Sequence, residues 1–146
     1  MTISFRTSLA GVTAAMLDGG FFDGWTAPPT PDDHLRILAG SDRIILAIDD
    51  ESGRVVGFVT AITDGVLAAY IPLLEVLPEW RGRGIGTALM RRMLDQLAAF
   101  PDIDLACDPD LQPFYARLGL QPGVGMYVRN YRPPAPAAST EAGGGG

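Results

Sequence analysis

The spacing of hydrophobic residues changes along the chain, and each change marks a different kind of element. Residues 43–48, 55–62 and 66–77 are rich in β-branched and other apolar residues and are separated by turn sequences, which predicts three extended strands. Over residues 84–100 the apolar positions recur every three or four residues, which predicts an amphipathic helix. The apolar face of this helix consists of Ile85, Leu89, Met93, Leu94 and Leu97.

Shorter elements are predicted on both sides of this centre. Short strands are expected at residues 3–6, 103–107 and 126–131, and helices at residues 9–17, from Pro31 onward and at residues 110–118. Antiparallel strands come first, and a strand–helix–strand–helix–strand series follows. The fold class is therefore a mixed α/β sheet in a single domain. Residues 133–146, "PPAPAASTEAGGGG", have a low-complexity composition with nothing to bury and are predicted to be a disordered tail.

Composition and charge exclude several classes of function. The formal net charge of −6 argues against nucleic-acid binding, and no apolar run reaches the roughly 18 residues that span a bilayer. All basic residues are arginine, which excludes Schiff-base lysine chemistry and the P-loop lysine. One cysteine and an N-terminus without a signal-peptide pattern lead us to expect a reducing, cytoplasmic location. We expect no metal.

The most unusual local feature is the turn between the third predicted strand and the long helix. In residues 81–87, "RGRGIGT", glycines and arginines alternate at the start of a helix, where unpartnered backbone N–H groups and the helix dipole favour an anion. Glycine allows close approach, and arginine adds charge-assisted bonds to phosphate. A solvated glycine-rich turn and a dinucleotide site remain alternatives. For the dinucleotide site, Gly82 and Gly84 match the first two glycines of the G-x-G-x-x-G pattern, but Thr87 stands at the position of the third glycine.

Two motifs together give the chain a family resemblance. The stretch "VLPEWRGRGIGTALM" is similar to motif A of the GNAT acyl-CoA-dependent N-acetyltransferases, [QR]-x-x-G-x-[GA], through Arg81, Gly84 and Gly86. The stretch "CDPDLQPFYARLGL" resembles motif B through Phe114, Tyr115, Gly119 and Leu120. The resemblance covers roughly residues 3–131, so we expect one GNAT-like domain over residues 1–132 with acetyl-CoA as the acyl donor.

The resemblance implies where acyl-CoA would bind. In this family the motif A strand splays from the next parallel strand, and pantetheine pairs with its exposed backbone, here Leu74, Glu75 and Val76. The backbone N–H of Val76 would polarise the thioester carbonyl. The pyrophosphate would lie on Arg81, Gly82, Arg83, Gly84, Ile85, Gly86 and Thr87. Asp108, Phe114 and Tyr115 would border the pantetheine, although many relatives have asparagine at the position of Asp108.

Pro72 carries information without the resemblance. Proline has no N–H to donate to a strand ladder, so inside a strand it indicates an edge, a bulge or a break. A bulge at Pro72 would suit a splayed strand. The alternative is a shorter strand that only begins at residue 73.

The resemblance makes Tyr115 the general acid that protonates the departing thiolate, where the alternative is ordinary aromatic packing with Phe114. Glu75 is a candidate base, and the alternative that the pattern favours is a structural or substrate-orienting carboxylate. Counting back from Val76 in steps of two reaches Pro72 and Tyr70, so Glu75 is expected on the opposite side of the strand unless a bulge reverses the alternation. Asp64 and His34 are weaker candidates for the base, and His34 is expected on the surface of its helix.

The acceptor side is the least defined part of the site. Phe22, Trp25 and Tyr70 are the candidate substrate-binding residues, with a role as core anchors left open for the first two. Cys107 is read as a small buried residue rather than a nucleophile. The resemblance implies direct acetyl transfer to a primary amine of a small molecule or peptide, and a homodimer is possible. The alternative is a catalytically silent acyl-CoA sensor or interaction module.

Overall fold

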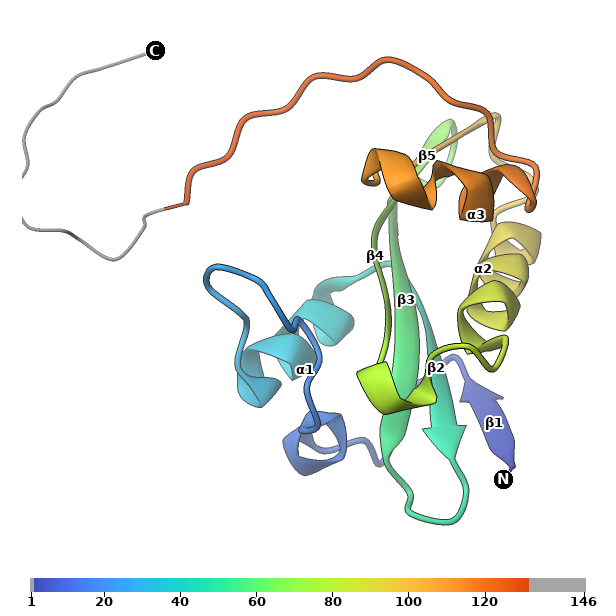
Figure 1. Cartoon of the computed structure of the whole chain (residues 1–146). Coiled ribbons are helices and arrows are strands. Elements are labelled where there is room, and N and C mark those ends of the chain that lie inside the picture. Colours follow the sequence, from blue (N-terminus) through green and yellow to red (C-terminus); the bar gives the residue numbers. More distant parts are fainter. Residues whose placement is uncertain (1, 132–146) are drawn as a thin grey trace, which may run out of the picture.

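A five-stranded mixed sheet forms the centre of residues 2–131, the part of the chain that the computed structural model describes (Figure 1). The strands lie in the order β1-β2-β3-β4-β5 and span Ile3–Arg6, Arg43–Asp49, Val55–Thr63, Ala68–Val76 and Asp102–Asp104. The first four are antiparallel to their neighbours, and β4 pairs with β5 in parallel. The predicted mixed α/β fold is therefore confirmed.

Helices cover both faces of this sheet (Figure 1). On one face lie α1, Pro31–Gly40, and the 3-10 turn η1, Ala14–Leu17; on the other lies α2, Ile85–Gln96. The helix α1 begins where the sequence predicts, because the Thr30 hydroxyl accepts the Asp33 N–H at 3.1 Å and Pro31 is preorganised for a first turn. The short α3, Gln112–Ala116, follows two further 3-10 turns, η2 at Pro78–Trp80 and η3 at Pro109–Leu111.

The core is continuous through the sheet. Strands β2 and β3 are buried along most of their length, because helices cover both of their faces. From α2 the side chains of Ile85, Leu89, Met90, Met93 and Leu97 are buried. Within residues 2–131 no helix combines the length and the apolar character that crossing a bilayer requires.

Strand β4 contains the bulge that Pro72 predicts. Thr60 pairs with Leu73 but Ile62 pairs with Tyr70, so Ile71 and Pro72 together lie opposite the single residue Ala61. The alternative of a strand that only begins at residue 73 is wrong, since β4 runs from Ala68 to Val76.

The bulge reverses the alternation of side chains along β4. Glu75 lies opposite Phe58, and Tyr70 lies opposite Ile62, on the face of the sheet that α1 covers. Val76 lies opposite Gly57, whose missing Cβ would touch Leu89 of α2. Simple counting in steps of two therefore misplaces Tyr70, which shares a face with Glu75 rather than with Val76.

Several predicted elements differ from the structure: the strand expected at residues 103–107 spans only Asp102–Asp104, and the helix expected at residues 110–118 spans only Gln112–Ala116. Only Ala14–Leu17 of the helix expected at residues 9–17 is helical, because Gly11 has a φ of 77° and Thr13 is extended. The long helix ends at Gln96 instead of residue 100. The strand expected at residues 126–131 is absent, since no neighbouring strand of the same chain offers these residues a ladder. The predicted disordered tail, residues 133–146, lies outside the described residues.

Candidate active site

The glycine-rich loop leads into α2 through two left-handed residues. Gly82 has a φ of 78° and Gly84 a φ of 81°, and Gly84 is the N-cap of the helix. Glycine is favoured here because other residues are strained in this conformation. No side chain caps the first turn of α2, and a Cβ at Gly82 or Gly84 would meet nothing within 4 Å. The first-turn amides thus have no side-chain cap and stand beside open space, as a phosphate cradle requires.

The two arginines of the loop lie along its exposed side. The Nε of Arg81 donates to the Val76 carbonyl at 3.1 Å, which ties the loop to the end of β4. The Nη2 of Arg83 donates to the Glu79 carbonyl at 3.1 Å, and its guanidinium lies 4.6 Å from the centre of the Trp80 ring. These bonds hold both guanidinium groups beside the loop.

Backbone amides of β4 point away from β3 at two positions. The Leu77 N–H donates to the Val56 carbonyl at 2.9 Å, which sets the phase of the antiparallel ladder. Since bonded and non-bonded pairs alternate, the N–H groups of Leu74 and Val76 point toward the β5 side. Within residues 2–131, strand β5 pairs with Ala68, Ala69 and Tyr70 of β4, and no strand of this part of the chain covers the same edge of β4 beyond Tyr70. The predicted splay between the parallel strands is present.

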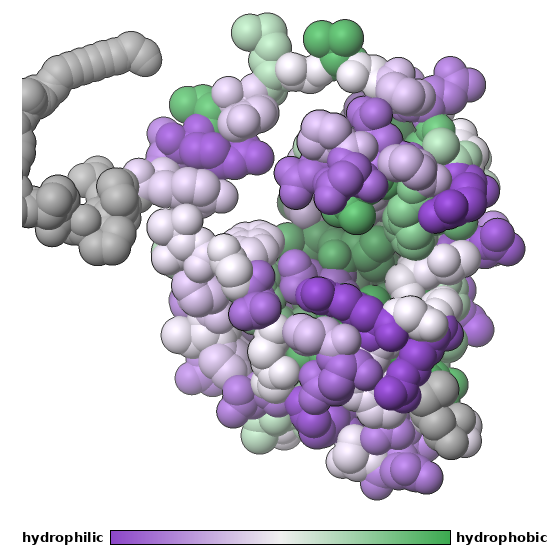
Figure 2. All heavy atoms as spheres, in the orientation of Figure 1, coloured by the Kyte–Doolittle hydropathy of each residue, from purple (hydrophilic) through white to green (hydrophobic). Residues whose placement is uncertain are grey.

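The gap beside β4 is an apolar hollow. Figure 2 shows it between α3 and the loop that precedes α2, with hydrophilic atoms along its rim. Three segments meet there: a Cβ built on Gly86 would lie 3.8 Å from both the Phe114 ring and the Val76 side chain. Motif A, motif B and the end of β4 therefore surround one space.

Tyr115 is held in α3 next to this space. Its ring packs edge-on against Phe114, with 4.9 Å between ring centres, and its side chain is half-buried. Burial raises the pKa of the Tyr115 phenol, and the nearby Cys107 raises it further. The hydroxyl thus remains a proton donor across the neutral pH range. Asp108 is exposed at the start of η3, and Cys107 is half-buried behind it.

Glu75 lies on the opposite face of β4, toward α1. Its carboxylate accepts the backbone N–H of Phe22 at 3.0 Å, and Phe22 has a φ of 64°, a rare conformation for a residue with a side chain. Burial raises the pKa of Glu75; the Phe22 N–H and the charge of Arg81 oppose this rise. Glu75 is thus both the anchor of a strained loop and a carboxylate with increased basicity.

His34 is buried, and the expectation of a surface position is wrong. Only 1% of His34 is exposed, its ring packs on Phe58 with 4.4 Å between centres, and Phe21 and Phe22 approach it edge-on. The His34 Nε2 atom has no hydrogen-bond partner, and burial lowers the pKa of His34 to about 4. The spacing of His34 and Leu38, four residues apart, was the available signal that both lie on the inner face of α1.

A cavity of about 230 Å³ lies above this aromatic cluster. Its lining is Leu17, Asp18, Gly19, Gly20, Phe21, Phe22, Pro28, Pro29, Thr30, Pro31 and His34. The Trp25 ring, which is 41% exposed, packs edge-on against Phe22 with 5.0 Å between centres. Phe22 is thus a buried anchor that also lines the cavity, and Trp25 is its exposed neighbour. Tyr70, exposed on the same face of β4 as Glu75, lies beyond the bulge.

Asp64 has a structural position that separates it from the site. Its carboxylate accepts the backbone N–H groups of Val66, Leu67 and Ala68 in the turn before β4, and these bonds lower its pKa. Glu75 lies near the other end of the same strand. Asp64 therefore stabilises the turn and is not placed to act as the base.

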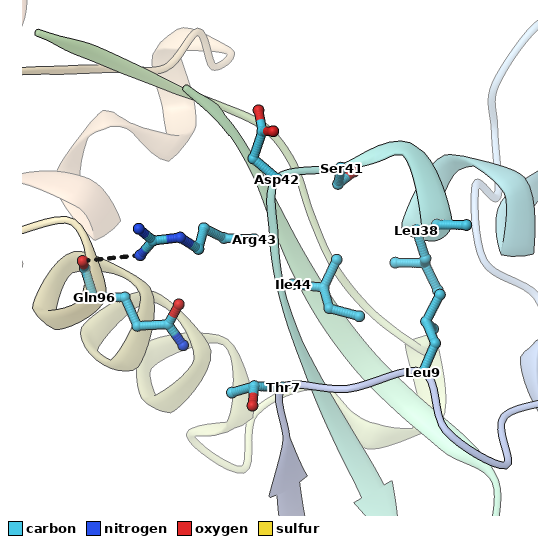
Figure 3. Close-up of a pocket in the computed structure, with 9 residues that line it drawn as sticks. Thr7, Leu9, Leu38, Ser41, Asp42, Arg43, Ile44 and Gln96 are labelled. Atoms are coloured by element: carbon cyan, nitrogen blue, oxygen red, sulfur yellow. Dashed lines mark hydrogen bonds between the residues drawn. The ribbon is translucent and has the colours of Figure 1, made fainter. Parts of the chain in front are cut away.

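A larger depression of about 720 Å³ lies away from the glycine-rich loop (Figure 3). Arg43 and Gln96 line it on one side of β2, joined by a 3.2 Å hydrogen bond from Arg43 to the Gln96 carbonyl, and Leu9 and Leu38 line it on the other (Figure 3). The lining residues lie on both faces of β2 and do not enclose a common space, so this depression is an open surface. Among residues 2–131 no group of three or more His, Cys, Asp or Glu side chains is arranged to hold a metal ion.

The comparison with known families decides between the alternatives for this site. The profile of the Acetyltransferase (GNAT) family matches residues 13–120, which include both motifs. The chain belongs to the GNAT acetyltransferase family. A dinucleotide-binding fold is therefore excluded, and motifs A and B of this GNAT protein are the segments that meet around the hollow beside β4.

Relatives of this GNAT protein agree with the assignment. A candidate acetyltransferase of known structure from Deinococcus radiodurans R1 is 51% identical, with a TM-score of 0.84 over 88% of each chain. The GNAT family protein SP0256 from Streptococcus pneumoniae TIGR4 is 25% identical, with a TM-score of 0.66 over 90% of this chain and 100% of that one. The uncharacterized N-acetyltransferase ycf52 of Porphyra purpurea is 32% identical over 101 residues, which cover 66% of this chain. The chain spans 57% of the length of that curated relative.

Proposed function

We propose that this GNAT protein transfers an acetyl group from acetyl-CoA to a primary amine by direct attack in a ternary complex. The observation that supports it most is the meeting of Val76, Gly86 and Phe114 around the hollow beside β4. There the edge of β4 with outward amides and the uncapped start of α2 lie close to Phe114 of α3, the helix that also carries Tyr115.

The fit of acetyl-CoA to this chain rests on two sets of backbone groups. The diphosphate would lie on the first-turn amides of α2, at Ile85, Gly86 and Thr87, with Arg81 and Arg83 adding charge-assisted bonds. The pantetheine amides would pair with the edge of β4 at Leu74 and Val76, as an additional strand would. Phe114 borders the same space, Asp108 would border it as well, and no metal takes part in this scheme.

The chemistry follows from the groups around the thioester. The amine nitrogen forms a bond to the carbonyl carbon, and the bond from that carbon to sulfur breaks. The Val76 N–H donates to the carbonyl oxygen, which stabilises the charge that develops there. The Tyr115 hydroxyl donates its proton to the departing sulfur. The amine attacks in its neutral form, and Glu75 receives the proton that the nitrogen loses, directly or through water, for which its raised pKa is favourable.

The acceptor would enter from the α1 face, between the loop that carries Phe22 and Trp25 and the strand that carries Tyr70 and Glu75. Exposed aromatic rings next to a carboxylate attract a cation through its charge and through contact with the ring faces. We therefore propose a cationic primary amine, of a small molecule or a peptide. We further propose a cytoplasmic protein, in line with its single cysteine, that works as a homodimer.

An assay of thiol release from acetyl-CoA over a panel of primary amines tests this proposal, together with calorimetry of CoA binding. The panel covers polyamines, aminoglycosides, amino acids and peptide N-termini. We expect one class to be acetylated, and Tyr115→Phe to lower kcat about 100-fold while CoA affinity is unchanged.

Two other outcomes would contradict the proposed activity. If the wild type and Tyr115→Phe bind CoA equally and neither acetylates any amine, the chain is an acyl-CoA sensor. If calorimetry detects no CoA binding, the cradle at residues 81–87 is an ordinary turn.

A further inference from the structure

One residue on the acceptor side has a backbone conformation that its side chain does not favour. Phe22 has a φ of 64°, in the left-handed region, and within residues 2–131 it is the one residue other than glycine with a positive φ. A strained conformation persists only where the surrounding structure holds it, and such positions gather at functional sites. Two features hold Phe22 in place: the burial of its ring and the bond that its backbone donates.

The rings of Phe21 and Phe22 are both buried although the two residues are adjacent. Both rings approach Phe58, with 5.2 and 6.0 Å between ring centres, and both lie edge-on to His34. Successive side chains of an extended chain point to opposite sides, so a turn of the backbone at Phe22 is what brings both rings to the same core. The same turn directs the Phe22 N–H toward β4.

The loop that carries Phe22, residues 18–25, is also fixed at its start. The Nη2 of Arg54 donates to the Asp18 carbonyl at 3.3 Å, and a Cβ on Gly19 would overlap the Arg54 guanidinium. Glycine at position 19 therefore lets Arg54 lie across the loop. Arg54 directly precedes β3 and Glu75 belongs to β4, so the sheet holds this loop at two points.

The two carboxylate oxygens of Glu75 have different surroundings. Oε1 accepts the Phe22 N–H at 3.0 Å. Oε2 accepts no hydrogen bond from residues 2–131, and it is not among the side-chain atoms of this part of the chain that are buried without a partner. Oε2 is therefore the oxygen that open space can reach, and its lone pairs are available to a ligand.

An anchor for the loop does not require an acid at position 75. The amide oxygen of glutamine would accept the same N–H without placing a charge in a half-buried position, which costs free energy. A carboxylate at this position thus has a use that an amide would not serve. The property that separates the two groups is that the carboxylate can take up a proton.

We propose that Phe22 is a positioning residue for proton transfer: its backbone N–H holds Oε1 of Glu75, so that Oε2 faces the acceptor and takes the proton of the amine. In this step an N–H bond of the acceptor nitrogen breaks, its electron pair stays on nitrogen, and the proton binds to a lone pair of Oε2. The Phe22 N–H stays on Oε1, so the carboxyl group keeps its orientation while its charge changes. This inference rests on the proposed acetyl transfer.

The Phe22 N–H also affects the basicity of Glu75. A donor to the charged carboxylate lowers its pKa, and here it opposes burial, which raises the pKa. Two charges act as well: Arg81, after β4, lowers the pKa of Glu75, and Asp23 of the loop raises it. On α1, burial lowers the pKa of His34 to about 4, so this residue is neutral above that pH. Loss of the Phe22 N–H should therefore raise the pKa of Glu75.

Two substitutions of Phe22 that differ in backbone preference give the first test. Phe22→Asn and Phe22→Val both remove the ring, but asparagine tolerates the left-handed conformation, whereas valine, which is β-branched, resists it. We expect the pKa of Glu75 to stay close to the wild-type value in Phe22→Asn and to rise in Phe22→Val. NMR titration of isotope-labelled glutamate carboxyl groups measures this pKa, and the signal that Glu75→Gln removes is that of Glu75.

A backbone substitution removes the donor and keeps the ring. Phenyllactic acid incorporated at position 22 replaces the N–H with an ester oxygen, which should raise the pKa of Glu75 and move the acid limb of kcat/KM to higher pH. At a pH below both acid limbs, kcat/KM should be about 10-fold lower than in the wild type. The matched ester at Trp25 removes the 3.1 Å bond to the Phe22 carbonyl and should leave the pKa of Glu75 at its wild-type value.

The results separate this inference from the proposed function. Equal pKa values of Glu75 in the wild type, Phe22→Val and the Phe22 ester would overturn the inference. A raised pKa that the acid limb of kcat/KM does not follow would overturn it as well, because Glu75 would then not be the group that takes the proton. A wild type that acetylates no amine contradicts the proposed function, whereas the NMR titration needs no substrate and still decides whether the Phe22 N–H controls Glu75.

Discussion

The two sides of β4 are built in different ways. The side that faces α2 and the gap toward β5 comes mainly from one stretch, residues 74–87, to which α3 adds Phe114 and Tyr115, and most of its polar groups are backbone amides. The side that faces α1 is assembled from a loop, a helix and two strands, and its groups are side chains: Phe22, His34, Phe58 and Glu75. A site made of backbone needs particular glycines at particular spacings, whereas a site made of side chains needs only that distant residues meet.

Left-handed glycines offer the sharpest test of the first side. Gly84 has a φ of 81° and Gly65, in the turn between β3 and β4, has a φ of 82°; a Cβ at either meets nothing within 4 Å. Gly84→Val and Gly65→Val therefore introduce a similar backbone strain. We expect Gly84→Val to weaken CoA binding about 1,000-fold, or ~4 kcal/mol, because it disturbs two or more charge-assisted bonds to phosphate.

The measurement is calorimetric titration of CoA into each variant, with thermal melting as the check on the fold. Gly65→Val should lower the melting temperature similarly and leave the CoA affinity within about two-fold. Equal losses of affinity in the two variants would mean that strain alone, and not the cradle, explains the effect.

Acid titration tests the second side through His34. The folded pKa of about 4 lies below the ordinary value of 6.5, so the unfolded chain binds more protons between these values. The free energy of unfolding should therefore fall as the pH drops from 6.5 to 4, by about 3 kcal/mol from this residue. His34→Leu should remove that part of the pH dependence and, because it removes an unpartnered polar atom, change stability at pH 7.5 by less than about 1 kcal/mol.

Urea unfolding at several pH values measures this difference. The wild type and His34→Leu should diverge below pH 6.5 and become parallel again below pH 4. Curves that stay parallel throughout would show that the imidazole titrates normally, and that the aromatic cluster opens to water.

Glu75→Gln carries the smallest expected effect and tests whether the carboxylate has a role in catalysis. Glutamine still accepts the Phe22 N–H, so the loop should stay in place and the melting temperature should be unchanged. We expect kcat/KM for the amine to fall at least about 10-fold, or ~1.4 kcal/mol. The rising acid limb of the pH–rate profile should lie above the ordinary carboxyl pKa of 4.5 and disappear in the variant.

Glu75→Ala is the companion variant. It leaves the Phe22 N–H without its partner and should also destabilise the fold by about 1–3 kcal/mol. If Glu75→Gln keeps the wild-type rate and acid limb, Glu75 serves only to hold the loop.

The same contrast explains what could be predicted from the sequence. The central strands, α1 and α2 could be predicted because their apolar spacing is local, and the turn before α2 could be predicted because its glycines leave a short signature in the sequence. The Pro72 bulge could also be predicted, because proline lacks the donor that a ladder needs.

Other features depend on contacts that no local pattern contains. The burial of His34 results from Phe21, Phe22 and Phe58, which come from two other parts of the chain. The bond from Phe22 to Glu75 spans 53 positions. The final strand was expected at residues 126–131 because its side chains alternate as those of a strand do. Alternation within one segment does not show whether a second strand is available to pair with it.

The extra residue in β4 changes which side chains of this strand face α1. Before Ile71 the even-numbered side chain of Tyr70 lies on the α1 face, whereas after Pro72 the odd-numbered side chain of Glu75 lies on that face. Deleting Pro72 would leave Ile71 alone opposite Ala61, so Tyr70 would stay opposite Ile62 on the face that carries Glu75, and the amides at Leu74 and Val76 would keep their direction. The deletion would remove the local irregularity of the strand without exchanging its two faces, so the inserted residue is what allows Tyr70 and Glu75, an odd number of positions apart, to share one face.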